Sequence, residues 1–217
     1  YKCRKGERSL FGFFSKDKKD GEHARIVIGK DTRRSSYMFE YSLVAGLTAS
    51  GADVYLLHVT TTPSVSYVVR SENFDCGIMI TASHNPPEYC GIKYIPDYAG
   101  PATSDITDEI TSNFDKQLES KSNGSMKLYN FAEDYFNHIS KIIDFEKIKT
   151  LDKNIIFNGL YSATIGYFDK LLCMNDIKFN SINMKHDKNF GGKMPEPKPQ
   201  YMQDLIELVK TSLNTVG

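Results

Sequence analysis

A serine and a histidine stand side by side after an apolar run, in the stretch "TASHNPPEYCGIKYI" at residues 81–95. Ser83 offers a hydroxyl, and the imidazole of His84 can orient that hydroxyl or move a proton. Lys93 follows ten residues after Ser83 and adds a permanent positive charge. These three groups on one spot would suit phosphoryl transfer, in which charge that develops on oxygen must be balanced.

The same residues are also typical of an ordinary turn, because serine, asparagine and proline favour turns for local reasons. In that interpretation His84 is a solvated side chain without a role. Ser83 lacks the flanking glycines of the G-x-S-x-G hydrolase motif, and the sequence contains no G-x-x-x-x-G-K-[ST] phosphate loop. On the residues alone, both interpretations stay open.

Two prolines fix where the strand before Ser83 must end. Pro86 and Pro87 have no backbone N–H, and Pro86 also favours extended backbone at Asn85. Ligands of open α/β sheets bind at the carboxyl ends of the strands. We therefore expect Ser83 and His84 to lie at the ligand-binding edge of a sheet.

From Arg25 onward, short β-branched runs alternate with amphipathic segments, which predicts an α/β layered fold. Strands are expected at 25–29, 53–59, 76–82, 91–95, 154–159 and 177–184. Helices are expected to begin at Ser35 or Ser36, Pro63, Ser104 and Phe131, and to span 162–175 and 201–213. The helix from Ser104 should carry Ile106, Ile110, Phe114 and Leu118 on one stripe. The helix after Ser35 or Ser36 should place Phe39, Leu43 and Leu47 on one face. The polar stretch 119–125 is the best linker candidate.

This pattern predicts three segments along the chain. They are a basic N-terminal segment at 1–24, a first domain at 25–122 and an incomplete second domain at 126–217. Both ends of the chain are expected to be cut, since it begins at Tyr1 and the second sheet has only begun when the sequence stops.

Composition excludes several classes of protein. The 217 residues are 40% hydrophobic and 25% charged, and 27 Lys and Arg balance 27 Asp and Glu, which argues against a nucleic-acid partner. The four cysteines (Cys3, Cys76, Cys90 and Cys173) form no C-x-x-C pair, which favours a reducing compartment. A long apolar stretch and a signal-peptide pattern are both missing, so we expect a cytoplasmic protein with no membrane partner.

The stretch "ITASHNPPEYCGIKYI" resembles the phosphoserine loop of the α-D-phosphohexomutases, the phosphoglucomutase/phosphomannomutase superfamily. Residues 26–70 are similar to the family's first domain, with Gly29, Asp31 and Arg33 in its Gly-x-Asp-x-Arg segment. Residues 189–209 resemble part of its second domain. The resemblance covers about residues 25–217. It implies three-layer α/β/α domains with mixed, mostly parallel sheets: the first domain and most of the second of a normally four-domain mutase.

The resemblance implies an isomerase that interconverts hexose 1-phosphate and 6-phosphate by intramolecular phosphotransfer. Ser83 would carry the phosphoryl group, and a bisphosphorylated sugar would be the intermediate. His84 and Lys93 would assist proton transfer and charge balance, while Asn85 and Arg33 would lie on the substrate side. For Arg33, as for Asp31, support of the loop is expected ahead of direct phosphate contact.

The resemblance also implies Mg²⁺, bound to a phosphate oxygen on Ser83 and to three aspartates of a loop that this sequence does not show. Glucose or mannose bisphosphate would act as activator. The missing C-terminal domains of the same protein would be needed as partners, so this chain alone is expected to be inactive.

The sugar and even the activity have alternatives. The segment "MPEPKPQ" at 194–200 favours glucose or mannose phosphate, whereas "GKDTR" and "SYMFE" also suit a phosphoglucosamine mutase. Two residues depart from the family pattern: Cys90 replaces a common asparagine, and Asn158 replaces a more usual acidic residue or proline. A non-catalytic short relative that serves as a binding or assembly module is therefore the other hypothesis.

Overall fold

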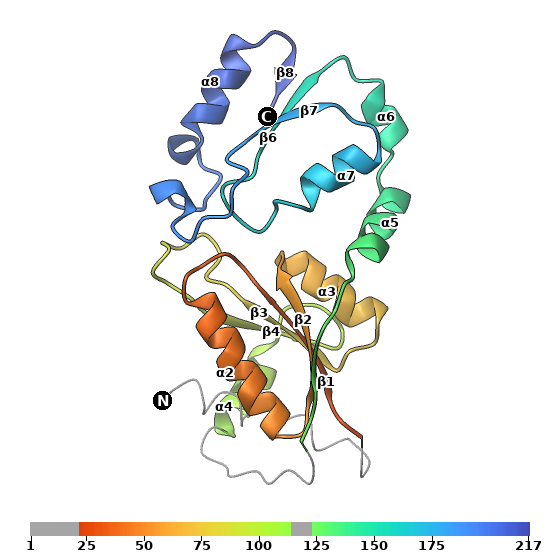
Figure 1. Ribbon diagram of the computed structural model, residues 1–217, viewed down its shortest axis with the longest axis vertical. Helices are drawn as coiled ribbons and strands as arrows, with labels where there is room; N and C mark the ends of the chain where they lie inside the picture. Colours follow the sequence, from red (N-terminus) through yellow and green to blue (C-terminus); the bar gives the residue numbers. More distant parts are fainter. Residues whose placement is uncertain (1–21, 114–122) are drawn as a thin grey trace. The chain divides into compact units, whose positions relative to one another are not determined.

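The computed structural model describes residues 22–113 and 123–217. Most of the basic segment 1–24, the expected stripe positions Phe114 and Leu118, and most of the linker 119–125 lie outside these ranges. Contacts divide the chain into two compact units, which are described separately (Figure 1). No helix in the described part of the chain is long and apolar enough to cross a membrane.

The first unit is built on a five-stranded sheet in the order β4-β3-β1-β2-β5. Neighbouring strands run parallel, except that β4 is antiparallel to β3. The strands are β1 (Arg25–Lys30), β2 (Asp53–Val59), β3 (Cys76–Ile80), β4 (Ile92–Pro96) and β5 (Met126–Leu128). The short strand β5 was not expected from the sequence, and it extends the first sheet beyond the polar stretch.

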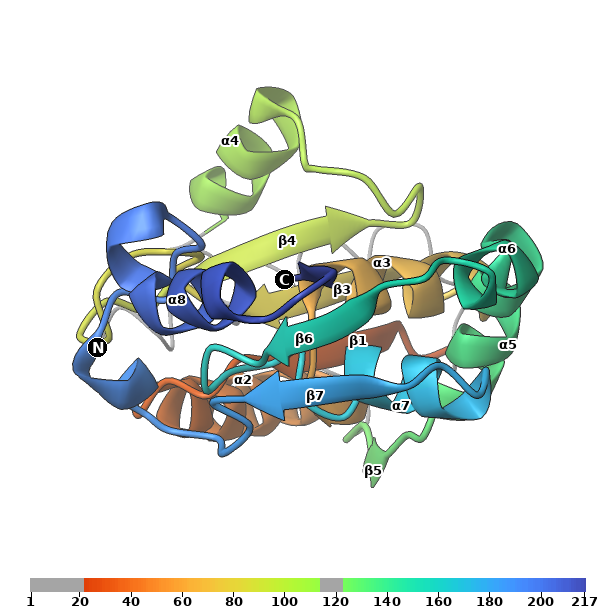
Figure 2. The same ribbon diagram turned by 90° about the horizontal axis from the view of Figure 1, so that it is seen from above.

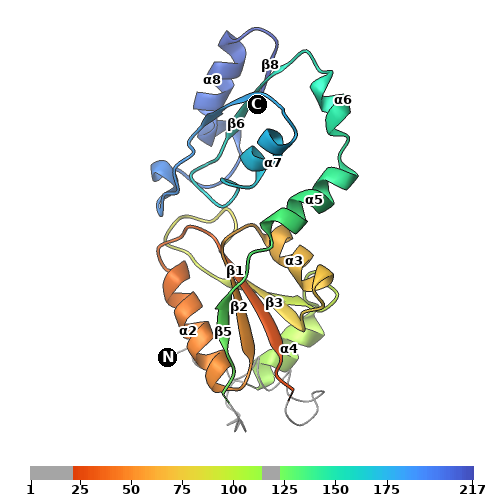
Figure 3. The same ribbon diagram turned by 45° about the vertical axis from the view of Figure 1, so that its right-hand side comes forward.

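Two helices cover opposite faces of this sheet (Figures 2 and 3). Ile28 of β1 belongs to a buried cluster with Leu43 and Leu47 of α2 (Ser36–Ala49). On the other face, Gly29 of β1 and Gly77 of β3 have no Cβ, which leaves room for Val65 of α3 (Thr62–Ser71). A third helix, α4, spans Ser104–Ser112. Successive side chains of β1 point to opposite faces of the sheet, so α2 packs on one face and α3 on the other. This is the predicted three-layer α/β/α arrangement.

The second unit holds a parallel three-stranded sheet in the order β7-β6-β8. Its elements are α5 (Ala132–Ile142), α6 (Phe145–Lys149), β6 (Asn154–Asn158), α7 (Phe168–Met174), β7 (Phe179–Ile182), the 3₁₀ turns η1 (Phe190–Gly192) and η2 (Pro199–Tyr201), α8 (Gln203–Thr211) and β8 (Thr215–Val216). Phe136, Phe145, Leu171, Leu172 and Ile177 form one buried cluster of this unit. By their contacts, Thr32–Arg34 and Ala82–Tyr89 also group with this unit.

The helix predicted over 162–175 is shorter than expected, since α7 begins only at Phe168. The residues before it form turns, with positive φ at Leu160, Tyr161 and Gly166. Positive φ is incompatible with a right-handed helix. Tertiary packing of this loop therefore overrides the helical period that the sequence suggests.

Candidate active site

The loop after β3 places Ser83, His84 and Asn85 at the exposed surface. Ser83 Oγ lies 3.3 Å from Nδ1 of His84, and in the tautomer that carries its proton on Nε2 this nitrogen can accept the hydroxyl proton. Ser83 also has a φ of 58°, which is uncommon for a residue with a side chain. Strained backbone of this kind is often found at functional positions.

Arg33 holds this loop from beneath. Its side chain is completely buried, and its guanidinium donates hydrogen bonds to main-chain oxygens at four positions of the loop. The acceptors are Ser83 (2.9 Å), Asn85 (2.8 Å), Tyr89 (3.0 Å) and Pro86. A guanidinium directed at four carbonyls inside the protein favours the bracing role over direct contact with a substrate phosphate.

The two prolines suit this brace. In a trans peptide the C=O and the following N–H point in opposite directions, and no cis peptide bond occurs in the described ranges. The carbonyls of Asn85 and Pro86 point to Arg33, and the nitrogens on the opposite side belong to Pro86 and Pro87, which carry no hydrogen. At these two peptide bonds the carbonyls bind Arg33, and the side that faces away from Arg33 carries no N–H group. After Ser83, by contrast, the N–H of His84 points away from Arg33.

Asp31 ties the base of the loop to the sheet and to α2. One carboxylate oxygen accepts from the hydroxyl of Ser36 at 2.9 Å, and the other accepts from the hydroxyl of Thr81 at 2.7 Å. The N–H of Asp31 donates to the main-chain oxygen of Ile80 at 3.1 Å. Asp31 is buried and joins the ends of β1 and β3, in agreement with the expected supporting role.

Lys93 lies in β4, paired with Met79 of β3, and its side chain is exposed. Its approach to Ser83 stays a prediction. Sequence reasoning missed a buried ion pair at the end of β1: Lys30 Nζ contacts both carboxylate oxygens of Glu40 at 2.6 and 2.7 Å. The ring of Tyr37 lies 4.5 Å from the same ammonium. The spacing of Ser36, Glu40, Leu43 and Leu47 on the buried face of α2 could have indicated this pair.

No three His, Cys, Asp or Glu side chains within residues 22–113 and 123–217 lie close enough together to hold a metal ion. A phosphate on Ser83 would supply oxygen ligands, but the described residues do not complete a magnesium site around it. They therefore do not by themselves fit the cofactor that the resemblance implies.

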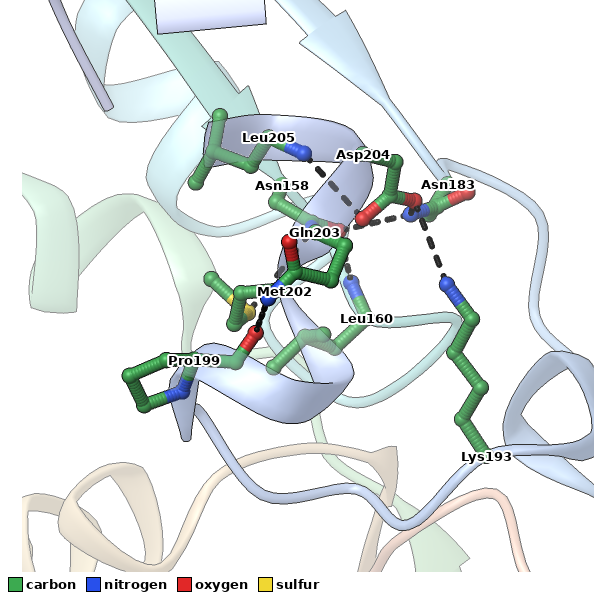
Figure 4. Close-up of polar contacts among 9 residues, drawn as sticks. All are labelled: Asn158, Leu160, Asn183, Lys193, Pro199, Met202, Gln203, Asp204 and Leu205. Carbon is green, nitrogen blue, oxygen red and sulfur yellow. Dashed lines mark hydrogen bonds and ion pairs between the residues drawn. The ribbon is translucent and has the colours of Figure 1, made fainter. Parts of the chain in front are cut away.

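A second polar cluster lies at the carboxyl ends of β6 and β7 (Figure 4). Asn183 donates from Nδ2 to Oδ1 of Asn158 at 3.1 Å and to Oδ2 of Asp204 at 2.9 Å. Asn158 Oδ1 also accepts from the N–H of Leu160 at 3.0 Å, and Lys193 lies 3.6 Å from Asp204. These groups satisfy one another, so the cluster stabilises the start of α8. The asparagine that replaces a usual acidic residue is a member of this network.

The pKa of Asp204 is lowered, first by the hydrogen bond from Asn183 and further by the Leu205 N–H and the charge of Lys193, against a smaller opposing effect of burial. The Asp204 carboxylate therefore stays ionised at a more acidic pH than an ordinary aspartate, and the hydrogen bonds that it accepts at the start of α8 persist with it.

Comparison with known proteins gives matches to two successive domains of one protein family. Residues 7–121 match the sequence model "phosphoglucomutase/phosphomannomutase, alpha/beta/alpha domain I", and residues 133–217 match that of domain II. The chain is 63% identical over 111 residues to the phosphoglucosamine mutase of Lachnospira eligens, a match that covers 51% of this chain and 24% of the relative. It is 41% identical over 150 residues to the phosphoglucosamine mutase of Brucella ovis, covering 66% and 31%.

A solved structure of a phosphoglucomutase/phosphomannomutase family protein from Burkholderia thailandensis superposes with a TM-score of 0.79 at 23% identity. The superposition covers 97% of this chain and 46% of that protein, and it supports the fold. The chain thus spans less than half the length of the relatives it matches. With both domain models matched in order, the chain belongs to the phosphoglucomutase/phosphomannomutase family.

Proposed function

We propose that this chain is the N-terminal part of a phosphohexomutase, in which Ser83 carries the phosphoryl group. The observation that supports this most strongly is the constellation at the loop: an exposed Ser83 at positive φ, a histidine nitrogen 3.3 Å from its hydroxyl, and a buried arginine bound to the carbonyls beneath.

The chemistry at Ser83 is a transfer of phosphoryl between oxygens. When a hexose bisphosphate donates, Ser83 Oγ forms a bond to phosphorus while the bond from phosphorus to the sugar oxygen breaks. The hydroxyl proton passes to Nδ1 of His84, and the sugar oxygen leaves as a hydroxyl after it takes up a proton. In the return step the phosphoserine donates to another hydroxyl of the sugar. Lys93 would balance charge on the moving group.

The substrate that we propose is glucosamine phosphate. The relatives at 63% and 41% identity are named phosphoglucosamine mutases, which favours this branch over glucose or mannose phosphate. Glucose or mannose phosphate remains the second candidate, because the "MPEPKPQ" segment suits it. Mg²⁺, the bisphosphate activator, a cytoplasmic location and the remaining domains of the mutase belong to the same proposal through the family.

The test is phosphoryl transfer to Ser83 in this chain joined to the remaining domains of a mutase relative, because the chain alone is expected to be inactive. The joined protein is incubated with glucosamine 1,6-bisphosphate, glucose 1,6-bisphosphate or mannose 1,6-bisphosphate, with and without Mg²⁺, and phosphate on Ser83 is followed by peptide mass spectrometry. We expect fastest labelling from the glucosamine compound and none in Ser83→Ala. Equal or faster labelling from a glucose or mannose donor would move the assignment to that branch. No labelling of Ser83 by any donor would favour the non-catalytic binding module.

A further inference from the structure

Phe190 lies in a tightly built loop of the second unit. The carboxylate of Asp187 accepts hydrogen bonds from the N–H groups of Asn189 (3.0 Å) and Gly191 (2.9 Å), which close the loop on itself. Phe190 has a φ of 53° and is only 2% exposed, although the two residues before it are exposed or nearly so. The loop therefore turns one aromatic side chain inward.

The buried ring of Phe190 contacts the side chain of Arg33. The carbon Cζ of Arg33 lies 5.1 Å from the centroid of the Phe190 ring, within the range of a cation–π contact. A second contact joins the same segments: the hydroxyl of Thr32 donates to the main-chain oxygen of Asp187 at 3.4 Å. Thr32–Arg34, the loop Ala82–Tyr89 and the Phe190 loop all fall in one contact unit.

We propose that Phe190 is a positioning residue for Ser83, acting through Arg33. The ring covers the guanidinium and keeps water from competing for its donors, so the four hydrogen bonds to the loop carbonyls form in a dry, low-dielectric setting. Those bonds hold the backbone at Ser83 in its strained conformation. The consequence for phosphoryl transfer rests on the proposed function, whereas the effect on the loop's backbone does not.

A purely structural role for Phe190 is the competing explanation, and it predicts a different pattern. Phe190 is not a member of the cluster formed by Phe136, Phe145, Leu171, Leu172 and Ile177. Loss of its ring should therefore disturb the Ser83 loop more than it disturbs that core. Phe136 is a suitable control, because it is 4% exposed and belongs to that core.

The experiment compares Phe190→Leu, Phe190→Tyr and Phe136→Leu in the unphosphorylated chain by amide hydrogen exchange. We expect Phe190→Leu to speed exchange in the peptide covering 83–89 by about tenfold, and Phe190→Tyr to keep the wild-type rate because the ring is retained. Phe136→Leu should leave that peptide unchanged. If Phe190→Leu unfolds the chain, Phe190→Met serves in its place. Unchanged exchange in 83–89, or an equal rise in Phe136→Leu, would overturn the proposal.

Two further measurements separate the mechanism from the proposed function. In an Arg33→Lys background, Phe190→Leu should add no further exchange in 83–89, because the ring acts through the guanidinium; an additive rise would contradict this. In the chain joined to the remaining domains of a mutase relative, labelling of Ser83 by a sugar bisphosphate should slow in Phe190→Leu at saturating donor and return in Phe190→Tyr. Should wild type itself take no label, the proposed function fails, while the exchange data still decide the role of Phe190.

Discussion

The guanidinium of Arg33 and the main-chain oxygen of Ser83 are joined by a hydrogen bond of 2.9 Å, fifty residues apart in sequence. The arginine side chain is completely buried, so this bond reaches the exposed serine from inside the protein. The residue proposed to carry the phosphoryl group is therefore held through its backbone, while its hydroxyl lies 3.3 Å from Nδ1 of His84.

Arg33→Met tests this brace. The change leaves four loop carbonyls without their charged donor, and we expect the free energy of unfolding to fall by about 3 kcal/mol or more. Urea denaturation measures the loss. The matched control is Arg34→Met, which removes an exposed arginine at the next position and should have little effect. Equal stability of the two variants would contradict the account.

The ion pair between Lys30 and Glu40 predicts a non-additive pair of mutations. Their side chains are 2% and 4% exposed, so Lys30→Met alone leaves a buried carboxylate and should cost about 3–5 kcal/mol. The double variant Lys30→Met/Glu40→Leu should recover most of this loss, as thermal and urea unfolding would show. Lys149→Met, which breaks a surface pair with Glu146, is the control and should be nearly silent. Additive losses in the double variant would argue against a coupled pair.

The cysteines should differ sharply in reactivity. Burial raises the pKa of the Cys76 thiol well above its usual value, and the nearby charge of Asp75 adds to this effect. Cys173 is exposed. Because the thiolate is the reactive form, iodoacetamide should label Cys173 in the folded chain and Cys76 only after unfolding, as judged by peptide mass spectrometry. Cys173→Ser identifies the fast site, and rapid labelling of native Cys76 would be inconsistent with the structure.

Asp204 predicts an acid-dependent contribution to stability. Its folded pKa lies below the ordinary value of 3.8, chiefly because Asn183 donates to it. A carboxyl with a lowered folded pKa stabilises the protein above its unfolded pKa, and this stabilisation disappears as the pH falls through the folded value. Asp204→Asn should therefore melt below wild type at neutral pH, and the gap should close below 3.8.

The control for Asp204 is Glu207→Gln, an exposed carboxylate on the same helix. Its melting temperature should follow wild type across the pH range. A gap between wild type and Asp204→Asn that stays constant down to acid pH would rule out the proposed ionic contribution.

Much of the fold could be predicted, because buried strands such as β1 and β3 are continuous apolar runs and Pro63 and the prolines after Ser83 mark boundaries. Short elements escaped prediction: β5 has three exposed residues, and only its pairing with β2 makes it a strand. Likewise, the residues just before α7 were expected to be helical, but they form a loop with positive φ values. That conformation depends on tertiary contacts.

The candidate site was predictable where it is local and not where it is long-range. The adjacency of Ser83 and His84 is written in the sequence. By contrast, the contact of Arg33 with Phe190 joins residues far apart in the chain, and no period or motif indicates it. The spacing of Glu40 with Leu43 and Leu47 places it on the buried face of α2, where a charged residue needs a partner, and this was the one signal in the sequence for its pair with Lys30.

The most direct test is to map phosphate on this chain, joined to the remaining domains of a mutase relative, after exposure to glucosamine 1,6-bisphosphate and Mg²⁺. We expect a single modified site at Ser83, absent in Ser83→Ala and formed more slowly in His84→Gln, which removes the imidazole 3.3 Å from the hydroxyl. Phosphate on other residues with none on Ser83, or an unmodified chain with every hexose bisphosphate tried, would contradict it.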